Sequence, residues 1–265
     1  MKKTFIVILL AISMAVIGVC AYEGLNLNRD TDADISADGL IDVDYSLDNN
    51  FAYSVIDTDE SLTYAPVGAR ARYGLVFYVG TAITQDSYSY MAIALAKQGY
   101  LVVLPKMTLN MAYAFYGKEE AAFNKYSDVK FFVGGHSQGG GAAVRRAQEN
   151  QDKLLGTILY APLCYNEDSI ADAQMPVLLI EATKDNVLTT DMKADAKTRL
   201  PTCYSAYILD GCHMSFSTFD SDAILNMFGD GPLNEEQKHV QKMLTIEYTL
   251  NFMKTVVFGQ YPMPI

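Results

Sequence analysis

The stretch VKFFVGGHSQGGGAAV, residues 129–144, joins an apolar strand to a helix through a glycine-rich turn. It contains a G-x-S-x-G sequence centred on Ser137. A short Gly/Ser pattern arises often by chance, but the order strand, pattern, helix is the one that a nucleophile elbow requires. Such a turn holds its serine in a strained backbone conformation, and the residues two before and two after it must be small. Gly135 and Gly139 meet this demand, so Ser137 is the candidate nucleophile.

Strands and helices alternate on both sides of this stretch. A continuous apolar run, which is typical of a strand buried on both faces, occurs at 74–79, and further strands are expected at 100–104, 129–133, 156–160, 177–181 and 205–209. Helices are expected from 86 to 99, over most of 109–126, over 142–150 and 189–198, and from 234 to 259, with a short helical stretch between 160 and 177. Two further short strands, 51–56 and 62–64, flank a polar turn. This alternation predicts an α/β fold with a mostly parallel central sheet and helices on both faces.

A serine nucleophile needs a general base, and the chain has three histidines. His213 follows the strand predicted at 205–209, at the same sheet edge as Ser137, and is the favoured base. His136 adjoins the serine and is expected to point away from it and to pack. His239 lies on the last helix, on a face expected to be solvated.

The base needs an acid to orient it, and Asp185 follows the strand predicted at 177–181. Glu181, still within that strand, and Asp210, at the end of the next strand, compete for this role. Asp185 is favoured because the order Ser137, Asp185, His213 is one of the known orders of a serine triad.

The tetrahedral intermediate of acyl transfer needs two N–H donors. One is expected from the backbone of Gln138, the residue after the nucleophile. The other is expected from the loop after the strand at 74–79, where Thr81 is the candidate.

Taken together, these motifs resemble the α/β-hydrolase superfamily, in particular a bacterial branch related to dienelactone hydrolases and called α/β-hydrolase fold-5. The resemblance covers about residues 70–258, and its carriers are 74–80, 94–107, 134–139, 183–185, 211–213 and 229–231. It implies the α/β-hydrolase fold and the triad, and it says little about the substrate. One departure concerns the oxyanion loop, where the family usually has Pro-Gly-Gly and this chain has Val79-Gly80-Thr81. A Cβ at Thr81 changes the shape of that pocket or the way in which the donor is presented.

The length of the connection between the strands at 156–160 and 177–181 gives an indication of the size of the substrate. In this superfamily a cap domain is usually inserted there, and residues 161–176 leave room for about one short helix. No cap domain is expected, and an open, shallow site favours small or surface-accessible esters. Its candidate lining residues are Tyr160, Cys164, Tyr165, Met214 and Phe216.

Composition excludes several classes of protein. Half of the 265 residues are hydrophobic and 19% are charged, which is typical of a folded domain and not of a disordered chain. Lysine and arginine total 20 and aspartate and glutamate total 31, giving a net charge of −11. An acidic chain gains nothing from counterion release on a phosphate backbone, so no nucleic-acid partner is expected.

Residues 1–21 are a candidate export signal, with two lysines, an uncharged apolar run and a cleavage site after Ala21. Two alternatives stay open: residues 4–22 are long enough to remain as an anchor helix, and residues 17–20 loosely resemble a bacterial lipobox. We expect a secreted protein, or one attached to the outer face of the cell membrane through this segment only.

Residues 22–50 are expected to form an acidic, solvated linker before a catalytic domain at 51–265. Within the linker, residues 34–41 mimic the first eight positions of an EF-hand calcium loop. The twelfth position, where a bidentate glutamate belongs, is Tyr45. The alternative to a calcium site is an acidic turn.

Four cysteines are present, and Cys20 belongs to the export signal. The other three allow at most one internal disulfide, for which Cys164 and Cys212 are the possible pair. Three unpaired thiols are the alternative, and Cys203 lies too far from Cys212 along one strand to reach it. No zinc-ligand spacing occurs.

The sequence therefore predicts an exported serine hydrolase that acts on a small-molecule ester and needs no metal or cofactor. An acyltransferase or a peptidase could use the same three residues. The alternative from another class is a non-catalytic cell-surface scaffold that keeps the hydrolase fold.

Overall fold

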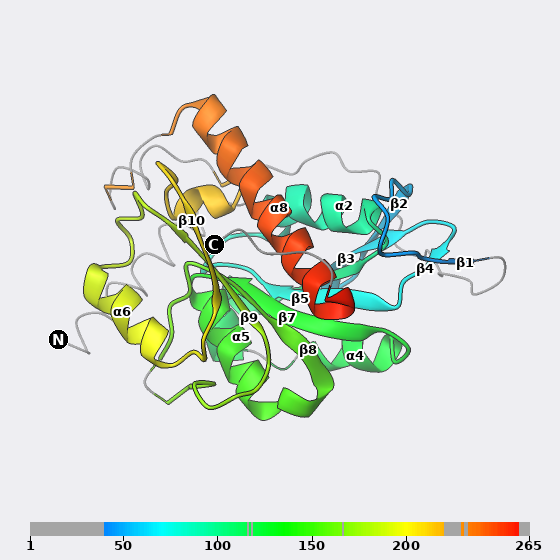
Figure 1. Cartoon of the computed structure of the whole chain (residues 1–265), viewed down its shortest axis with the longest axis horizontal. Helices are drawn as coiled ribbons and strands as arrows, with labels where there is room; N and C mark the ends of the chain where they lie inside the picture. Colours follow the sequence, from blue (N-terminus) through cyan, green and yellow to red (C-terminus); the bar gives the residue numbers. More distant parts are fainter. Residues whose placement is uncertain are drawn as a thin grey trace.

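An eight-stranded sheet forms the centre of the computed structural model, which describes residues 40–115, 117, 119–165, 167–219, 229–230 and 233–259 (Figure 1). The strand order is β10-β9-β8-β7-β5-β6-β3-β2. The strands are β2 (Tyr53–Asp57), β3 (Ser61–Pro66), β5 (Tyr73–Tyr78), β6 (Leu101–Pro105), β7 (Lys130–His136), β8 (Leu154–Tyr160), β9 (Val177–Ala182) and β10 (Tyr204–Ile208). Pairing is parallel from β10 to β6 and antiparallel at β6–β3 and β3–β2. The prediction of a mostly parallel sheet is confirmed.

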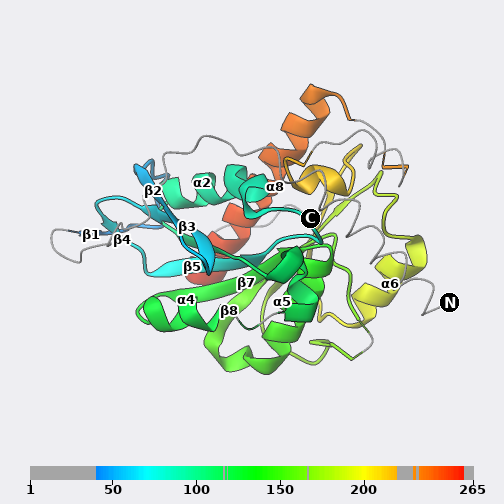
Figure 2. The same cartoon turned by 180° about the vertical axis from the view of Figure 1, so that it is seen from behind.

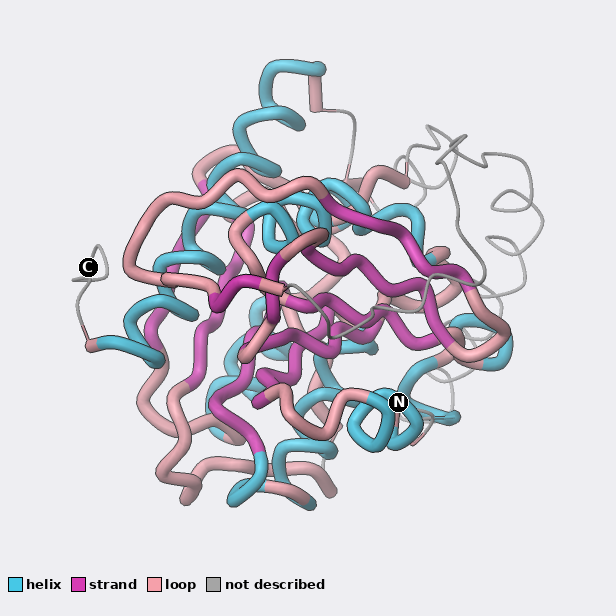
Figure 3. Tube along the Cα trace, turned by 90° about the vertical axis from the view of Figure 1, so that its right-hand side faces the viewer, coloured by secondary structure: helices cyan, strands magenta, loops and turns pink. Residues whose placement is uncertain are grey.

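Helices cover both faces of the sheet, as predicted (Figures 1 and 2). On one side lie α2 (Ser89–Lys97) and α8 (Glu235–Phe258), and on the other lie α4 (Glu120–Lys125), α5 (Gln138–Glu149) and α6 (Thr190–Thr198). Figure 3 shows the strands between these two groups of helices. Alternate residues of each central strand enter different cores, with Phe77 packing beneath α2 and α8 and Tyr78 packing towards α5. The apolar runs are continuous in sequence because both strand faces are buried.

The region 109–126 is mostly helical, as predicted, but the helical residues are divided among a 3-10 turn (Thr108–Asn110), α3 (Ala112–Phe115) and α4. Leu109 and Asn110 have φ values of 55° and 48°, which a right-handed helix cannot accommodate. The short helical stretch predicted between 160 and 177 is wrong, because residues 161–165 and 167–176 form turns and loops without a helix. This short connection between β8 and β9 leaves no room for a cap domain.

The expected linker over residues 22–50 does not stay solvated to its end. Tyr45 is 3% exposed, and its hydroxyl donates to the Gly99 carbonyl at 2.9 Å. The two-residue strand β1 (Ile41–Asp42) pairs in parallel with β4 (Ala69–Arg70), at the right of Figure 1. Burial of Tyr45 fixes residues 40–50 to the domain. The remainder of the linker, the calcium-loop residues 34–39 and the export signal lie outside the described residues.

The last helix begins and ends where it is predicted to. Asn234 caps α8 with a capping box to Gln237, and Gly259 follows its last turn. None of the helices in the described ranges is both long and apolar enough to cross a bilayer.

Candidate active site

Ser137 lies at the sharp turn between β7 and α5, with φ 55° and ψ −123°. This conformation is strained for a residue with a side chain. The neighbouring glycines are required by space, because a Cβ at Gly135 would lie 2.2 Å from the Gly139 carbonyl oxygen. A Cβ at Gly139 would lie 2.3 Å from the Tyr78 carbonyl oxygen of β5. The turn therefore has the geometry of a nucleophile elbow.

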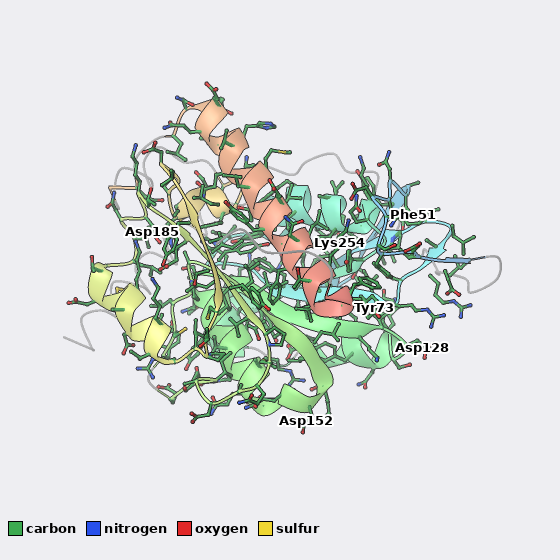
Figure 4. All side chains as sticks on the ribbon, in the orientation of Figure 1. Phe51, Tyr73, Asp128, Asp152, Asp185 and Lys254 are labelled. Atoms are coloured by element: carbon green, nitrogen blue, oxygen red, sulfur yellow. The ribbon has the colours of Figure 1, made fainter. Side chains whose placement is uncertain are left out.

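Asp185 and His213 form a buried pair at the carboxyl edge of the same sheet. Asp185, labelled in Figure 4, follows β9, and His213 follows β10. The His213 Nδ1 and Asp185 Oδ2 atoms lie 2.9 Å apart. The other oxygen, Oδ1, accepts hydrogen bonds at 3.0 Å from the N–H groups of Val187 and Leu188. These bonds fix the carboxylate so that its second oxygen faces the imidazole.

The environment keeps Asp185 ionised. Burial acts to raise the pKa of this carboxyl group, but the attraction and hydrogen bond of His213 and the backbone donor of Leu188 outweigh burial and lower the pKa below its usual value. The competing acids face elsewhere. Glu181 pairs with Lys197 at 2.6 Å, and Asp210 pairs with a surface lysine.

His213 lies next to the nucleophile elbow. Its ring centroid is 4.6 Å from that of His136, the residue before Ser137. Among the described residues, the Ser137 hydroxyl forms no hydrogen bond, including to His213. Hydrogen bonds between nucleophile and base are often long before substrate binds and tighten in the Michaelis complex. The third histidine, His239, is exposed on α8.

His136 is buried and packs, which agrees with its expected role. Its Nδ1 lies 2.7 Å from the Tyr88 hydroxyl, which also accepts the Gly80 N–H at 3.0 Å. Burial, with the nearby His213, lowers the pKa of His136 well below its usual value. His136 is therefore neutral, and its ring packs against the ring of His213.

The two expected oxyanion donors are unengaged. Within the described part of the chain, neither the backbone N–H of Gln138 nor that of Thr81 has a hydrogen-bond partner. The side-chain amide of Gln138 donates instead to the Tyr165 hydroxyl at 2.9 Å. The N–H of Gln138 opens α5, where the helix dipole favours negative charge.

Some of the predicted lining residues belong to the core. Tyr160 and Phe216 are fully buried and stack with ring centroids 5.5 Å apart. Cys164 and Met214 are also largely buried, and only Tyr165 is half-exposed among the five. Aromatic residues at strand ends pack here into the layer below the site.

Two residues that sequence reasoning missed hold the loops that carry Asp185 and His213. Asp230 is 1% exposed and accepts the N–H groups of His213 and Asn186 on Oδ1 and that of Met214 on Oδ2, at 2.8–3.2 Å. The side-chain amide of Gln241, on α8, accepts the Cys212 N–H at 3.0 Å and donates to the Cys212 carbonyl at 2.8 Å. The sequence offered only a weak signal, the Asp between two glycines at 229–231.

Replacing Asp230 by Asn is expected to lower both stability and activity. The Asn side chain keeps one acceptor but places an N–H₂ group where Met214 N–H needs an acceptor, so one buried donor loses its partner. The free energy of unfolding should fall by about 1–3 kcal/mol, and kcat should fall because the His213 loop shifts. Urea denaturation and ester hydrolysis measure the two effects. Unchanged kcat in Asp230→Asn would show that this carboxylate does not position the base.

The neutral, buried His136 predicts acid sensitivity. Below its ordinary pKa of about 6.5, the unfolded chain binds a proton on this residue that the folded chain does not, because the folded pKa is lowered. The free energy of unfolding should therefore fall as pH drops below about 6.5, by up to roughly 1.4 kcal/mol per pH unit for this group. Denaturation at pH 7.5, 6.5 and 5.5 measures the slope. His136→Gln should flatten it and the exposed control His239→Gln should not; equal slopes in all three proteins would contradict the assignment.

The cysteines form no disulfide in the described ranges. Cys164, Cys203 and Cys212 are all free thiols, so the alternative of unpaired thiols holds in this structure. Burial raises the pKa of Cys203 and Cys212 to about 11, which makes both thiols unreactive at neutral pH. No group of three or more metal-binding side chains gathers among the described residues.

Comparison with known proteins agrees with this architecture. No curated protein matches the chain significantly. The model of the alpha/beta hydrolase family matches residues 74–223, which is more than half of the chain. This range begins in β5, before the loop that carries Thr81, and contains the elbow, Asp185 and His213. The chain belongs to the alpha/beta hydrolase family.

Proposed function

We propose that this hydrolase is an exported serine esterase that cleaves small or surface-accessible carboxylic esters. The observation that carries the proposal is the juxtaposition of two features at one sheet edge. One is the strained Ser137 on its elbow, and the other is the buried Asp185–His213 pair with its 2.9 Å hydrogen bond. Strain at a serine beside a histidine–carboxylate pair is the arrangement that nucleophilic acyl transfer needs.

In the proposed reaction, Ser137 Oγ attacks the acyl carbon while His213 Nε2 takes the hydroxyl proton. Asp185 holds His213 in the tautomer with a proton on Nδ1 and stabilises the imidazolium that forms. The N–H groups of Gln138 and Thr81 bind the oxyanion. His213 then gives its proton to the leaving alkoxide, and a water molecule activated by His213 releases the acid from the acyl-enzyme.

The preference for esters with little bulk follows from the connection between β8 and β9. The described residues of this connection, 161–165 and 167–176, form no cap over the sheet edge and do not enclose a long acyl chain. Export is part of the proposal because residues 1–21 have the charged start and apolar run of a secretory signal. The net charge of the full sequence, −11, agrees with a soluble small-molecule substrate and not with a polyanionic one.

Stopped-flow hydrolysis of p-nitrophenyl acetate and butyrate tests the proposal. An acyl-enzyme should give a burst of p-nitrophenol stoichiometric with enzyme, followed by a slower steady rate. Ser137→Ala, purified in parallel, should give no burst. A folded wild-type protein that hydrolyses none of a panel of short esters would overturn the proposal and would indicate the non-catalytic scaffold instead.

A further inference from the structure

Tyr165 is a half-exposed side chain beside the elbow, and its hydroxyl has one donor to spare. It lies in the connection between β8 and β9, and its hydroxyl oxygen accepts a hydrogen bond at 2.9 Å from the side-chain amide of Gln138, the residue after the nucleophile. Among the described residues, no acceptor takes the proton of the Tyr165 hydroxyl. A phenol both accepts and donates hydrogen bonds, so this group retains a donor that a substrate can use.

Ring stacking and an ion pair hold the Tyr165 ring in place. The ring stacks on that of Tyr113, on α3, with centroids 3.7 Å apart and planes at 27°. The guanidinium group of Arg145 lies 4.3 Å from the centroid of the Tyr113 ring. Arg145 is itself fixed by a 2.8 Å ion pair with Asp168, which is 3% exposed. A donor that is fixed before binding loses little conformational entropy when it meets its acceptor, so more of the hydrogen-bond energy appears as affinity.

The first turn of α5 separates Tyr165 from the loop after β5. A Cβ at Gly139 would lie 2.3 Å from the Tyr78 carbonyl oxygen, at the start of that loop. A Cβ at Gly141 would instead lie 3.2 Å from the ring of Tyr165. Two residues of an α-helix are rotated by about 200° around its axis, so Gly139 and Gly141 face nearly opposite directions. The loop after β5 and the Tyr165 ring therefore flank this turn from opposite sides.

The groups on the acyl carbon face different directions in the proposed reaction. The oxyanion faces the loop after β5. The leaving oxygen faces His213, whose ring packs against His136 in the strand before the nucleophile, with centroids 4.6 Å apart. The direction that remains for the acyl chain runs over the first turn of α5, where Tyr165 lies.

We propose that Tyr165 is a specificity-determining residue, whose hydroxyl donates a hydrogen bond to an oxygen atom on the acyl chain of the ester. This inference rests on the proposed esterase function and names its substrate class, which is short esters with a polar oxygen in the acyl group near the scissile carbonyl. A site that offers a hydrogen bond to a substrate atom discriminates against the isostere that lacks this atom. Because Tyr165 is half-exposed, water can take the place of the missing oxygen, and the discrimination is moderate.

Tyr165→Phe is the decisive variant, because phenylalanine keeps the stack on Tyr113 and removes only the hydroxyl. The substrates are p-nitrophenyl methoxyacetate and p-nitrophenyl butyrate, whose acyl chains have the same length and differ by an ether oxygen in place of a CH₂ group. In wild type, the ratio of their kcat/KM values should exceed the ratio of their alkaline hydrolysis rates without enzyme. In Tyr165→Phe this ratio should fall about five- to tenfold through the loss of one hydrogen bond, with kcat/KM for the butyrate changed by less than about twofold. Tyr207→Phe, on the edge strand β10 and 53% exposed, is the matched control and should keep the wild-type ratio.

An unchanged ratio in Tyr165→Phe would overturn the proposal, and an equal fall in both kcat/KM values would assign Tyr165 a structural role instead. Butyl acetate and 2-methoxyethyl acetate form the corresponding pair on the alcohol side of the ester. An effect of Tyr165→Phe that is confined to this second pair would place the hydroxyl beside the leaving group and would also overturn the proposal. Failure of the esterase function itself gives a different result, because wild type then hydrolyses neither p-nitrophenyl ester in a way that depends on Ser137.

Discussion

Ser137→Ala is expected to lower kcat for short esters by about 10⁴- to 10⁶-fold, the range found when the nucleophile of a serine triad is removed. The reason is that alanine at the elbow leaves His213 and Asp185 in place but removes the only atom that can form the acyl-enzyme. Binding should persist, because the oxyanion donors and the walls of the site do not change. The protein should remain folded, since alanine fits the space that serine occupies. Steady-state hydrolysis and circular dichroism measure the two results.

The control for this prediction is Ser205→Ala, an exposed serine on the edge strand β10. It should retain wild-type kcat and rule out a general effect of losing a hydroxyl. An Ser137→Ala protein with more than one tenth of wild-type activity would show that the hydrolysis arises elsewhere.

Asp185→Asn is expected to lower kcat by about 10⁴-fold with little loss of folding stability. An Asn side chain that keeps its carbonyl oxygen towards Val187 and Leu188 must point its N–H₂ group at His213 Nδ1. Two donors then face each other, so the imidazole takes the tautomer with its proton on Nε2 and can no longer accept the proton of Ser137. The 2.9 Å hydrogen bond between Asp185 and His213 is the observation on which this prediction rests.

Asp128→Asn is the matched control for Asp185→Asn. Asp128 is exposed and precedes β7, at the sheet edge opposite to the elbow (Figure 4). Its replacement should leave kcat unchanged. Should Asp185→Asn lose less than tenfold in kcat, Asp185 would not be the acid that orients the base.

Sequence reasoning reached the strands and the elbow because their signals are local. The mostly apolar residues at 129–133 predict a strand that is buried on both faces. The glycines around Ser137 predict a tight turn. The positions of Asp185 and His213 at one edge follow from the parallel sheet alone, since the carboxyl ends of parallel strands share an edge.

Sequence reasoning did not predict features that depend on contacts between segments far apart in the chain. The region 109–126 is broken because Asn110 is held by distant partners: it accepts from Ala82 N–H on its carbonyl and from the Gln85 side chain on its amide oxygen. Tyr45 is buried because Gly99 and Arg72 offer it hydrogen bonds. Neither partner can be inferred from the residues that surround these positions in the sequence.

The last helix shows the same limit. Its apolar row, which includes Val240 and Phe252, suggests the buried face, yet Val240 is 45% exposed and Gln241, Thr245 and Thr249 are fully buried. These polar side chains are satisfied individually, Gln241 by the backbone of Cys212 and Thr249 by the Tyr160 hydroxyl at 2.6 Å. A buried polar residue becomes predictable only when its partner is known.

Labelling with a fluorescent fluorophosphonate tests the central claim most directly, because this reagent reacts only with an activated serine. Folded wild-type protein should be labelled, with mass spectrometry placing one phosphonyl group on Ser137, and neither Ser137→Ala nor Asp185→Asn should be labelled at a comparable rate. Wild-type protein that is folded and unlabelled, or a label that persists in Ser137→Ala, would contradict the account.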